Sequence, residues 1–284
     1  MGEIKRIAVI GAGTMGHGIA QVAAMSGYTV VLNDREAGIL ERAQKKVEEN
    51  LDKGVARGKV DEATRTAALK NLSVEVEIDA AVKDADLVIE AVIEDLSLKQ
   101  TLLAQVEAQV GEATILGSNT SSLPLTQIAT ALKRPGQLIG MHFFNPVHIM
   151  RLVELVVHDA TTDAVRDAAL ALVARIGKDP IVVKDSPGFA SSRLGVVLGL
   201  EAMRMVEQGV ASPADIDKAM ELGYKHPMGP LKLTDVVGLD VRLAVAETLF
   251  RELKSDQYRP PEILREKVKA GEVGKKAGKG FYDW

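Results

Sequence analysis

The stretch that decides the fold is Arg6-Ile7-Ala8-Val9-Ile10-Gly11-Ala12-Gly13-Thr14-Met15-Gly16-His17-Gly18. Residues 7–10 form a continuous apolar run, which predicts a strand that is buried on both faces. Three glycines follow in the spacing G-x-G-x-x-G, and apolar residues then recur at near-helical intervals. A strand, a glycine turn and a helix in this order predict a site for the pyrophosphate of a dinucleotide.

Each glycine of the motif has its own expected role. Gly11 permits the tight turn, Gly13 lets a pyrophosphate approach the backbone, and Gly16 lets the helix pack closely on the strand. The amides at the start of the helix, around Thr14 and Met15, would face the phosphates. Glycine turns also occur for purely structural reasons, so the motif alone is weak evidence.

A second strand strengthens the dinucleotide interpretation. Residues 28–33 are strongly β-prone and end at Asp34, roughly the ~20 residues past the glycines at which an acidic ribose ligand is expected. A carboxylate there accepts hydrogen bonds from the ribose hydroxyls and repels a 2′-phosphate, which favours NAD over NADP. The adjacent Arg35 would partly offset that repulsion. The alternative is that Asp34 is only a turn residue or helix N-cap before Glu36.

The composition restricts the class of protein. With 284 residues, of which 46% are hydrophobic and 26% charged, the chain can bury a substantial core, and we expect two domains. A net charge of -4 without a basic tract argues against nucleic acid as a partner. No apolar run approaches the ~20 residues of a membrane span. Cysteine is absent and the first strand leaves no room for a signal peptide, so we expect a cytoplasmic protein without disulfides or a structural zinc site.

Strands and helices alternate through the first two thirds of the chain, which is typical of a doubly wound α/β sheet of the Rossmann type. A helical hairpin, formed by helices at 36–57 and 61–70, is expected as an insertion between strands. A helix at 97–110 is expected to have Ser97 as its cap, and another helix covers 161–176. The expected strands are 7–10, 28–33, 72–76, 87–92, 114–117, 137–143, 151–157 and 181–183.

The pattern changes at Ser186, which we take as the boundary between a dinucleotide-binding domain (1–185) and an all-helical domain (186–284). Residues 189–208 are apolar nearly all round, so this helix should be covered on several sides. Ser212-Pro213 opens a further helix. Two more helical segments are expected at 229–253, with a break near Gly238, and at 261–270.

Among the five histidines, His142 is the best candidate for a general base, because it ends a strand and leads into an Asn-Pro turn. Glu154 on the next strand would come alongside it if residues 143–150 form a tight connection. A carboxylate on one ring nitrogen would fix the tautomer and stabilise the imidazolium. The alternative is that the two residues are unrelated. The polar loop Ser118-Asn119-Thr120-Ser121-Ser122 is either a substrate site or simple turn chemistry.

Along essentially its whole length, the chain resembles the L-3-hydroxyacyl-CoA dehydrogenases, and within them most closely the 3-hydroxybutyryl-CoA dehydrogenases. The resemblance is carried by six motifs that together are highly specific. They are Gly-Ala-Gly-Thr-Met-Gly at 11–16, Ser-Asn-Thr-Ser-Ser at 118–122, His-Phe-Phe-Asn-Pro at 142–146 with Leu-Val-Glu at 152–154, Asp-Ser-Pro-Gly-Phe at 185–189, His-Pro-Met-Gly-Pro at 226–230, and Gly-Lys-Lys at 274–276 with Gly-Phe-Tyr at 280–282.

The resemblance implies an NAD-dependent enzyme that reversibly oxidises an (S)-3-hydroxyacyl-CoA, of short chain, to the 3-ketoacyl-CoA. His142 would be the general base and Glu154 its partner. Ser121 would hold the substrate 3-oxygen, and Asn145 would help to place substrate and cofactor. A turn amide is the alternative for Asn145.

The same resemblance assigns further binding residues. Glu94, Lys99, Asn119 and Lys276 match positions at the cofactor, and the residues near the CoA-contacting hairpin are Asn50 and Arg57. The alternatives are a solvated helix charge for Lys99 and an exposed C-terminal charge for Lys276. The helical domain would form a homodimer interface and close over the acyl chain.

Two departures from the family pattern leave alternatives open. Ser192 precedes Arg193 where the family usually has Asn, so its shorter side chain would reach the substrate through a water, and the substrate preference would shift. His148 also stands where a proline or small residue is usual. One alternative is therefore a dinucleotide-binding sensor or structural homologue with impaired catalysis. Another is a dehydrogenase of free β-hydroxyacids, although the lysine that such enzymes use in the linking helix is absent until Lys218.

Overall fold

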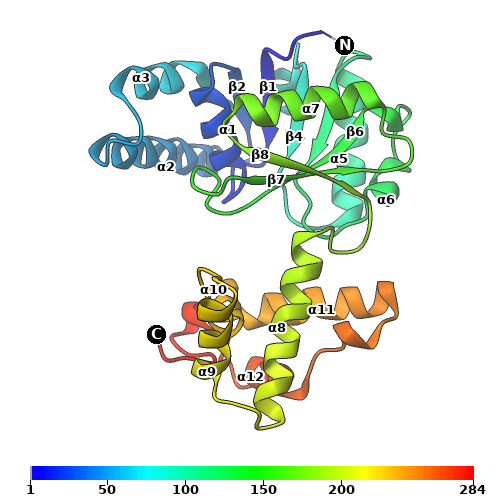
Figure 1. The fold of residues 1–284 in the computed structure, drawn as a ribbon. Helices are drawn as coiled ribbons and strands as arrows, with labels where there is room; N and C mark the ends of the chain where they lie inside the picture. Colours follow the sequence, from blue (N-terminus) through cyan, green and yellow to red (C-terminus); the bar gives the residue numbers. More distant parts are fainter. Residues whose placement is uncertain (1) are drawn as a thin grey trace. The chain divides into compact units, whose positions relative to one another are not determined.

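The computed structural model describes residues 2–284 as two compact units, one ending at Asp185 and the other running Ser186–Trp284 (Figure 1). The first unit is built on one sheet of eight strands in the order β3-β2-β1-β4-β5-β6-β7-β8. Strands β1 to β6 are parallel, whereas β7 is antiparallel to β6 and β8 is parallel to β7. The strands are β1 (Arg6–Ile10), β2 (Thr29–Asn33), β3 (Leu72–Glu75), β4 (Leu87–Glu90), β5 (Ile115–Ser118), β6 (Leu138–Phe143), β7 (Leu152–Val157) and β8 (Asp179–Lys184).

The order β3-β2-β1-β4-β5-β6 is that of a doubly wound dinucleotide-binding sheet, so the predicted α/β fold is confirmed. Successive side chains of β1 point to opposite faces of the sheet, and those of residues 7–10 are all buried. This explains why the strand is a continuous apolar run. Helices α1 and α7 pack on one face, and Figure 1 shows α5 and α6 behind the sheet.

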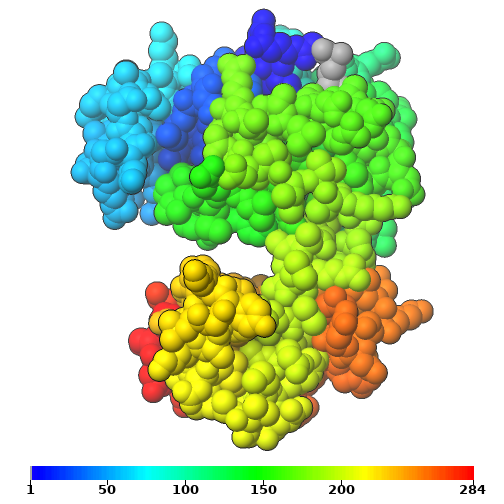
Figure 2. All heavy atoms as spheres, in the orientation of Figure 1, coloured from blue at the N-terminus to red at the C-terminus, as the bar shows by residue number. Residues whose placement is uncertain are grey.

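Seven helices belong to this unit among the residues that the structure describes. Helices α2 and α3 form the predicted hairpin and project to one side of the sheet, where Figure 2 shows them in light blue. Short connections elsewhere keep the remaining helices against the sheet. The helices are α1 (Gly16–Met25), α2 (Ala37–Ala56), α3 (Glu62–Asn71), α4 (Ile78–Val82), α5 (Leu96–Gln109), α6 (Leu125–Ala129) and α7 (Asp163–Arg175), with a 3₁₀ turn η1 (Pro135–Gln137).

The expected cap of α5 was wrong. The helix begins at Leu96, and the side chain of Asp95 accepts a hydrogen bond of 2.7 Å from the backbone N–H of Leu98. Ser97 lies inside the first turn. A carboxylate at the cap position also interacts favourably with the positive end of the helix dipole, so Asp95 is the better cap of the two.

The second unit is helical, as predicted, with its own core formed around Leu200, Met203, Leu231 and Leu249. The break near Gly238 is confirmed, since this residue has φ +106° between α10 and α11. The elements are α8 (Ser191–Glu207), α9 (Pro213–Lys218), a π turn η2 (Ala219–Gly223), α10 (Pro230–Val237), α11 (Leu239–Leu253), η3 (Asp256–Tyr258), α12 (Glu262–Lys269) and η4 (Lys275–Ala277).

Helix α8 is covered on several sides, as its composition predicts, except near its start. It begins at Ser191 rather than at residue 189, and it packs against α9, α10, α11, α12 and η3. Leu194, in contrast, is 68% exposed. The expectation of cover on several sides is therefore confirmed for most of the helix, and Leu194 in its first turn is left exposed. None of the helices among residues 2–284 combines the length and the apolarity that crossing a bilayer requires.

Two buried carboxylates anchor the C-terminal segment of the helical unit, which Figure 2 shows in red at the surface. Asp235 accepts hydrogen bonds from Phe281 N (2.8 Å), Tyr282 N (2.9 Å) and Trp284 Nε1 (2.9 Å). Asp217 accepts one from the Tyr282 hydroxyl (2.7 Å). Burial and this contact raise the pKa of Tyr282. The tail is thus fixed by charge-assisted bonds inside the unit.

We predict that Asp235→Ala destabilises the helical unit by about 3–5 kcal/mol, because three hydrogen bonds to a buried charged group are lost together. Trp284 is the single tryptophan, so its fluorescence in a thermal unfolding experiment reports this segment directly. Asp256→Ala is the matched control, since the Asp256 side chain is 82% exposed and its ion-pair partner among residues 2–284 is the nearby Arg259. Equal midpoints for the two variants would contradict the anchoring role.

Candidate active site

The glycine turn has the geometry that a pyrophosphate site requires. Gly11 has φ +95°, and a Cβ there would lie 2.8 Å from the carbonyl oxygen of Ala91 on the neighbouring connection. A Cβ on Gly16 would lie 1.7 Å from the Gly11 carbonyl oxygen, so only glycine allows the helix to start so close to the strand. Nothing lies within 4 Å of a Cβ built on the exposed Gly13. The backbone is therefore open to a ligand at this point.

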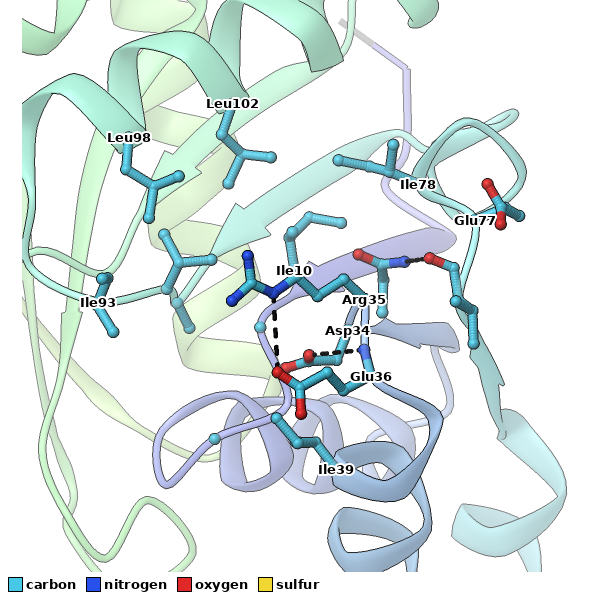
Figure 3. Close-up of a pocket in the computed structure, with 16 residues that line it drawn as sticks. Ile10, Asp34, Arg35, Glu36, Ile39, Glu77, Ile78, Ile93, Leu98 and Leu102 are labelled. Carbon is cyan, nitrogen blue, oxygen red and sulfur yellow. Dashed lines mark hydrogen bonds and ion pairs between the residues drawn. The ribbon is translucent and has the colours of Figure 1, made fainter.

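A cavity of about 660 Å³ extends from this turn along the ends of β1, β2 and β4. Figure 3 shows Ile93, Leu98 and Leu102 on one side of it and Glu77 and Ile78 on the other. Ile93 is 74% exposed and Leu98 40%, so apolar side chains are available to cover a flat ring. The turn and the cavity together fit a dinucleotide with its adenosine end in the cavity.

Asp34 lies in the wall of this cavity and is bonded to the glycine turn. Its Oδ2 accepts a hydrogen bond from Ala12 N (2.9 Å), and its Oδ1 accepts one from Glu36 N (3.2 Å). Helix α2 begins at Ala37 with Glu36 in the cap position, so Asp34 is not the N-cap of that helix. Arg35 is 91% exposed at its side chain, and its Nε lies 3.8 Å from Glu36 Oε1 (Figure 3).

His142 and Glu154 are brought together by the antiparallel pairing of β6 and β7, in which they are direct partners. The His142 Nδ1 to Glu154 Oε2 distance is 2.8 Å. His142 is 7% exposed and Glu154 fully buried, so the pair is shielded from water. The ring of Phe144 packs against the imidazole with centroids 4.4 Å apart. The conditional prediction that a tight connection would pair these two residues is thus met by the fold.

Glu94 organises the hydroxyl-rich loop that follows β5. Its Oε1 accepts hydrogen bonds from Thr120 Oγ1 (2.7 Å), Ser121 N (2.8 Å) and Ser122 N (3.0 Å), and more weakly from the hydroxyls of both serines (3.2 Å each). Burial acts to raise the pKa of Glu94, but Lys99 and these donors outweigh it and lower the pKa. The carboxylate therefore stays charged and fixes the backbone of Ser121.

Lys99 is fully buried in an ion-pair network that the sequence did not reveal. Its Nζ lies 2.8 and 2.9 Å from the two oxygens of the buried Glu90 and 3.4 Å from Glu94 Oε2. Ser118 Oγ also donates to Glu90. Within residues 2–284, the donors of Lys99 are thus used to hold the β4–α5 and β5–α6 loops. Glu90 was missed as a positioning residue, although it is an acid in an otherwise apolar strand.

Two amides stand at the ends of β5 and β6. Asn119 Oδ1 accepts a hydrogen bond of 3.0 Å from Phe143 N, which ties the hydroxyl loop to the strand that carries His142. Asn145 lies exposed in the connection from β6 to β7. One edge of the sheet therefore carries the Ser121 loop, the hydrogen-bonded pair of His142 and Glu154, and Asn145.

The remaining predicted residues lie in the hairpin and in the helical unit. Asn50 is half-buried on α2 and donates to Gln21 Oε1 of α1 (3.2 Å), whereas Arg57 is exposed at the end of α2. Ser192 is half-buried in the first turn of α8. Lys276 is half-exposed, and its Nζ donates a hydrogen bond of 2.6 Å to Asp240 Oδ2.

We predict that Gly16→Ala weakens NADH binding by at least about 30-fold, because the added methyl forces the helix away from the turn. Titration of NADH fluorescence measures the affinity. Gly111→Ala is the control, since its methyl would meet only Thr114 Oγ1 at an ordinary 3.8 Å. Unchanged NADH affinity in Gly16→Ala would show that the turn does not hold the pyrophosphate.

Two family profiles match nearly all of the chain: "3-hydroxyacyl-CoA dehydrogenase, NAD binding domain" over residues 6–186 and "3-hydroxyacyl-CoA dehydrogenase, C-terminal domain" over 188–284. The chain is 41% identical to the 3-hydroxybutyryl-CoA dehydrogenase of Clostridioides difficile, over 98% of this chain and 99% of the relative. It is 40% identical to the mitochondrial hydroxyacyl-coenzyme A dehydrogenase of Rattus norvegicus, over 99% and 91%. The crystal structure of (S)-3-hydroxybutyryl-CoA dehydrogenase from Ralstonia eutropha is similar with a TM-score of 0.96 at 42% identity, over 99% of both chains. The chain belongs to the 3-hydroxyacyl-CoA dehydrogenase family.

Proposed function

We propose that the protein catalyses the reversible NAD-dependent oxidation of a short-chain (S)-3-hydroxyacyl-CoA, such as 3-hydroxybutyryl-CoA, to the 3-ketoacyl-CoA. The observation that carries the proposal is the buried His142–Glu154 pair, at the same sheet edge as the glycine turn. A base without a dinucleotide, or a dinucleotide turn without a base, would each fit many other functions. Relatives named 3-hydroxybutyryl-CoA dehydrogenase at about 40% identity supply the substrate class.

His142 is the proton-handling group in this mechanism. With its Nδ1 bonded to Glu154, proton exchange with the substrate falls to Nε2. In oxidation the imidazole takes the proton of the 3-hydroxyl, and Glu154 stabilises the imidazolium that forms. A bound nicotinamide cofactor would supply the redox chemistry, which is hydride transfer to and from C3 of the substrate. In reduction, the imidazolium supplies the proton to the 3-oxygen.

Ser121 and Asn145 place the substrate. Glu94 fixes the Ser121 backbone, so the hydroxyl has a defined position from which to bond the 3-oxygen. Asn145 lies three residues after His142 and would offer its exposed amide to the substrate. For the cofactor, Asp34 would accept bonds from the ribose hydroxyls and favour NAD over NADP, and Asn119 lies at the same sheet edge, at the end of β5. The cofactor role of Lys276 stays a prediction. Asn50 and Arg57 on α2 contribute polar and positive groups for the CoA moiety.

The two alternative functions are less well supported. Burying a His–Glu pair costs desolvation free energy. A sensor without catalysis gains nothing from such a pair, whereas a proton-transfer enzyme needs it. A dehydrogenase of free β-hydroxyacids would need a lysine where α8 begins, and this helix opens with Ser191, Ser192 and Arg193. Ser192 in place of an asparagine is compatible with activity at a changed substrate preference.

We predict that the purified protein oxidises NADH in the presence of acetoacetyl-CoA, more efficiently than NADPH. His142→Ala lowers kcat by about 10²–10⁴-fold because proton transfer is lost, while NADH affinity stays unchanged. Glu154→Gln lowers kcat by about 10² because the imidazolium loses its partner.

His148→Ala is the control, since this exposed histidine lies six residues after His142, outside strand β6. Equal activity of His142→Ala and the wild type would overturn the mechanism. Tight NADH binding without turnover of 3-ketoacyl-CoA substrates of any chain length would favour the sensor.

We also propose that the helical unit forms a homodimer. Leu194, Leu222 and Tyr224 are 68%, 72% and 76% exposed, which is unusual for large apolar side chains. Burying them against a second copy would remove this apolar surface from water. Acyl-CoA is the only other partner that the proposal requires, and nucleic acid is not expected. The cytoplasmic location stays a prediction from the composition.

We predict that sedimentation gives twice the chain mass for the wild type, and that Leu222→Lys together with Tyr224→Lys shifts the protein towards one chain mass by adding unpaired charge to the interface. Val76→Lys is the control, because Val76 is an exposed apolar residue of the sheet unit. A wild type that sediments as a single chain at micromolar concentration would contradict the dimer.

A further inference from the structure

The connection between β6 and β7 has to be rigid, although most of it is exposed. It spans residues 144–151, carries Asn145, and sets the register that places Glu154 opposite His142. Asn145, Pro146 and the stretch 148–151 are all exposed. Such a segment buries too little apolar surface to hold itself in place.

Two contacts fix this connection from inside the unit. Val147 is buried and packs on α1, where a Cβ on Gly18 would come within 2.9 Å of the Val147 Cβ. The second contact is Lys178, whose Nζ donates to the backbone oxygens of Val147 (2.5 Å) and Met150 (2.7 Å). The Lys178 ammonium thus binds two backbone oxygens of the connection that are three residues apart in sequence.

Lys178 is itself held firmly. It follows Gly177, which has φ +72° at the end of α7, and its backbone N–H donates to Val173 O (3.1 Å). The next residue, Asp179, starts β8 and donates its N–H to Arg151 O (2.8 Å). These two backbone hydrogen bonds hold the short linker before β8 to α7 on one side and to the exposed connection on the other.

The charge on Lys178 is unusual for its position. The residue is 8% exposed, and no carboxylate lies within ion-pairing distance of its Nζ in the described part of the chain. Burial, and then the nearby Arg151, lowers the pKa of Lys178. An apolar side chain in the same space would avoid the desolvation free energy of a buried charge. It would also leave the carbonyl groups of Val147 and Met150 without their donor.

We propose that Lys178 is a positioning residue for the reaction: it holds the β6–β7 connection so that Asn145 and the His142–Glu154 pair keep their catalytic geometry. The inference rests on the proposed function for its effect on turnover. It assigns Lys178 no contact with substrate or cofactor. Its effect should therefore fall on kcat rather than on cofactor affinity, because a misplacement of about 1 Å costs up to ~10²-fold in rate.

The test compares Lys178→Met, Lys178→Arg and the control Lys184→Met, which removes an exposed lysine of β8 that pairs only loosely with Asp159 at 3.5 Å. With acetoacetyl-CoA and NADH, Lys178→Met should lower kcat by about 10–100-fold with NADH affinity within two-fold of wild type. Lys178→Arg, which keeps donors for the carbonyls, should retain more of the activity. Lys184→Met should match the wild type.

A second readout does not depend on activity. Limited trypsin digestion, with the cleavage after Arg151 located by mass spectrometry, should be at least about ten-fold faster in Lys178→Met than in the wild type or Lys184→Met, because the connection opens more often. Unchanged cleavage and kcat would overturn the proposal. So would loss of NADH binding together with kcat, since that reports general unfolding. Absence of wild-type turnover would defeat the proposed function, while the cleavage comparison would still decide the role of Lys178.

Discussion

The hydrogen bond between His142 and Glu154 depends on one reversal of chain direction. Strands β1 to β6 are parallel, and a parallel neighbour of β6 would need a crossover of a dozen residues or more. Because β7 is antiparallel, a residue only twelve positions after the histidine lies directly opposite it. The remaining features of the catalytic edge, including the buried Val147 and Lys178, serve to keep this return in register.

Buried charge is the second constraint on the site. Glu90 and Lys99 are both fully buried, and exchanging such a pair for apolar residues of similar volume often stabilises a protein. Here the pair supports Glu94, which in turn fixes the backbone of Ser121 and Ser122. The network is thus better explained by the position of the hydroxyl loop than by stability. The sheet thus carries a network of buried charges behind the hydroxyl loop.

The sequence allowed the sheet, the helical hairpin, the helical second unit and the His142–Glu154 pair to be predicted, because periodicity, glycine spacing and strand ends are local signals. Partners of buried side chains are not local. Spacing alone could not show that Lys99 turns inward to Glu90, since a lysine on a helix is usually solvated. It also could not choose between Asp95 and Ser97 as a cap, because both lie within one turn of the helix start. The exposed Leu194 was unexpected for a different reason: composition does not tell which neighbour covers an apolar face.

The order of the strands explains why the cofactor and the base can meet. Along the sheet edge, Asp34 follows β2, the glycine turn follows β1, Glu94 follows β4, the Ser121 loop follows β5 and His142 ends β6. Neighbouring strands are about 4.8 Å apart, so the glycine turn and His142 are separated by three strand spacings, roughly 14 Å. A dinucleotide bound with its pyrophosphate on β1 and its adenosine towards β2 must extend its other end towards β4 and β5. The hydroxyl loop and His142 are the next groups along the edge, so in the proposed function the strand order would place adenosine, pyrophosphate, nicotinamide and proton donor in this sequence.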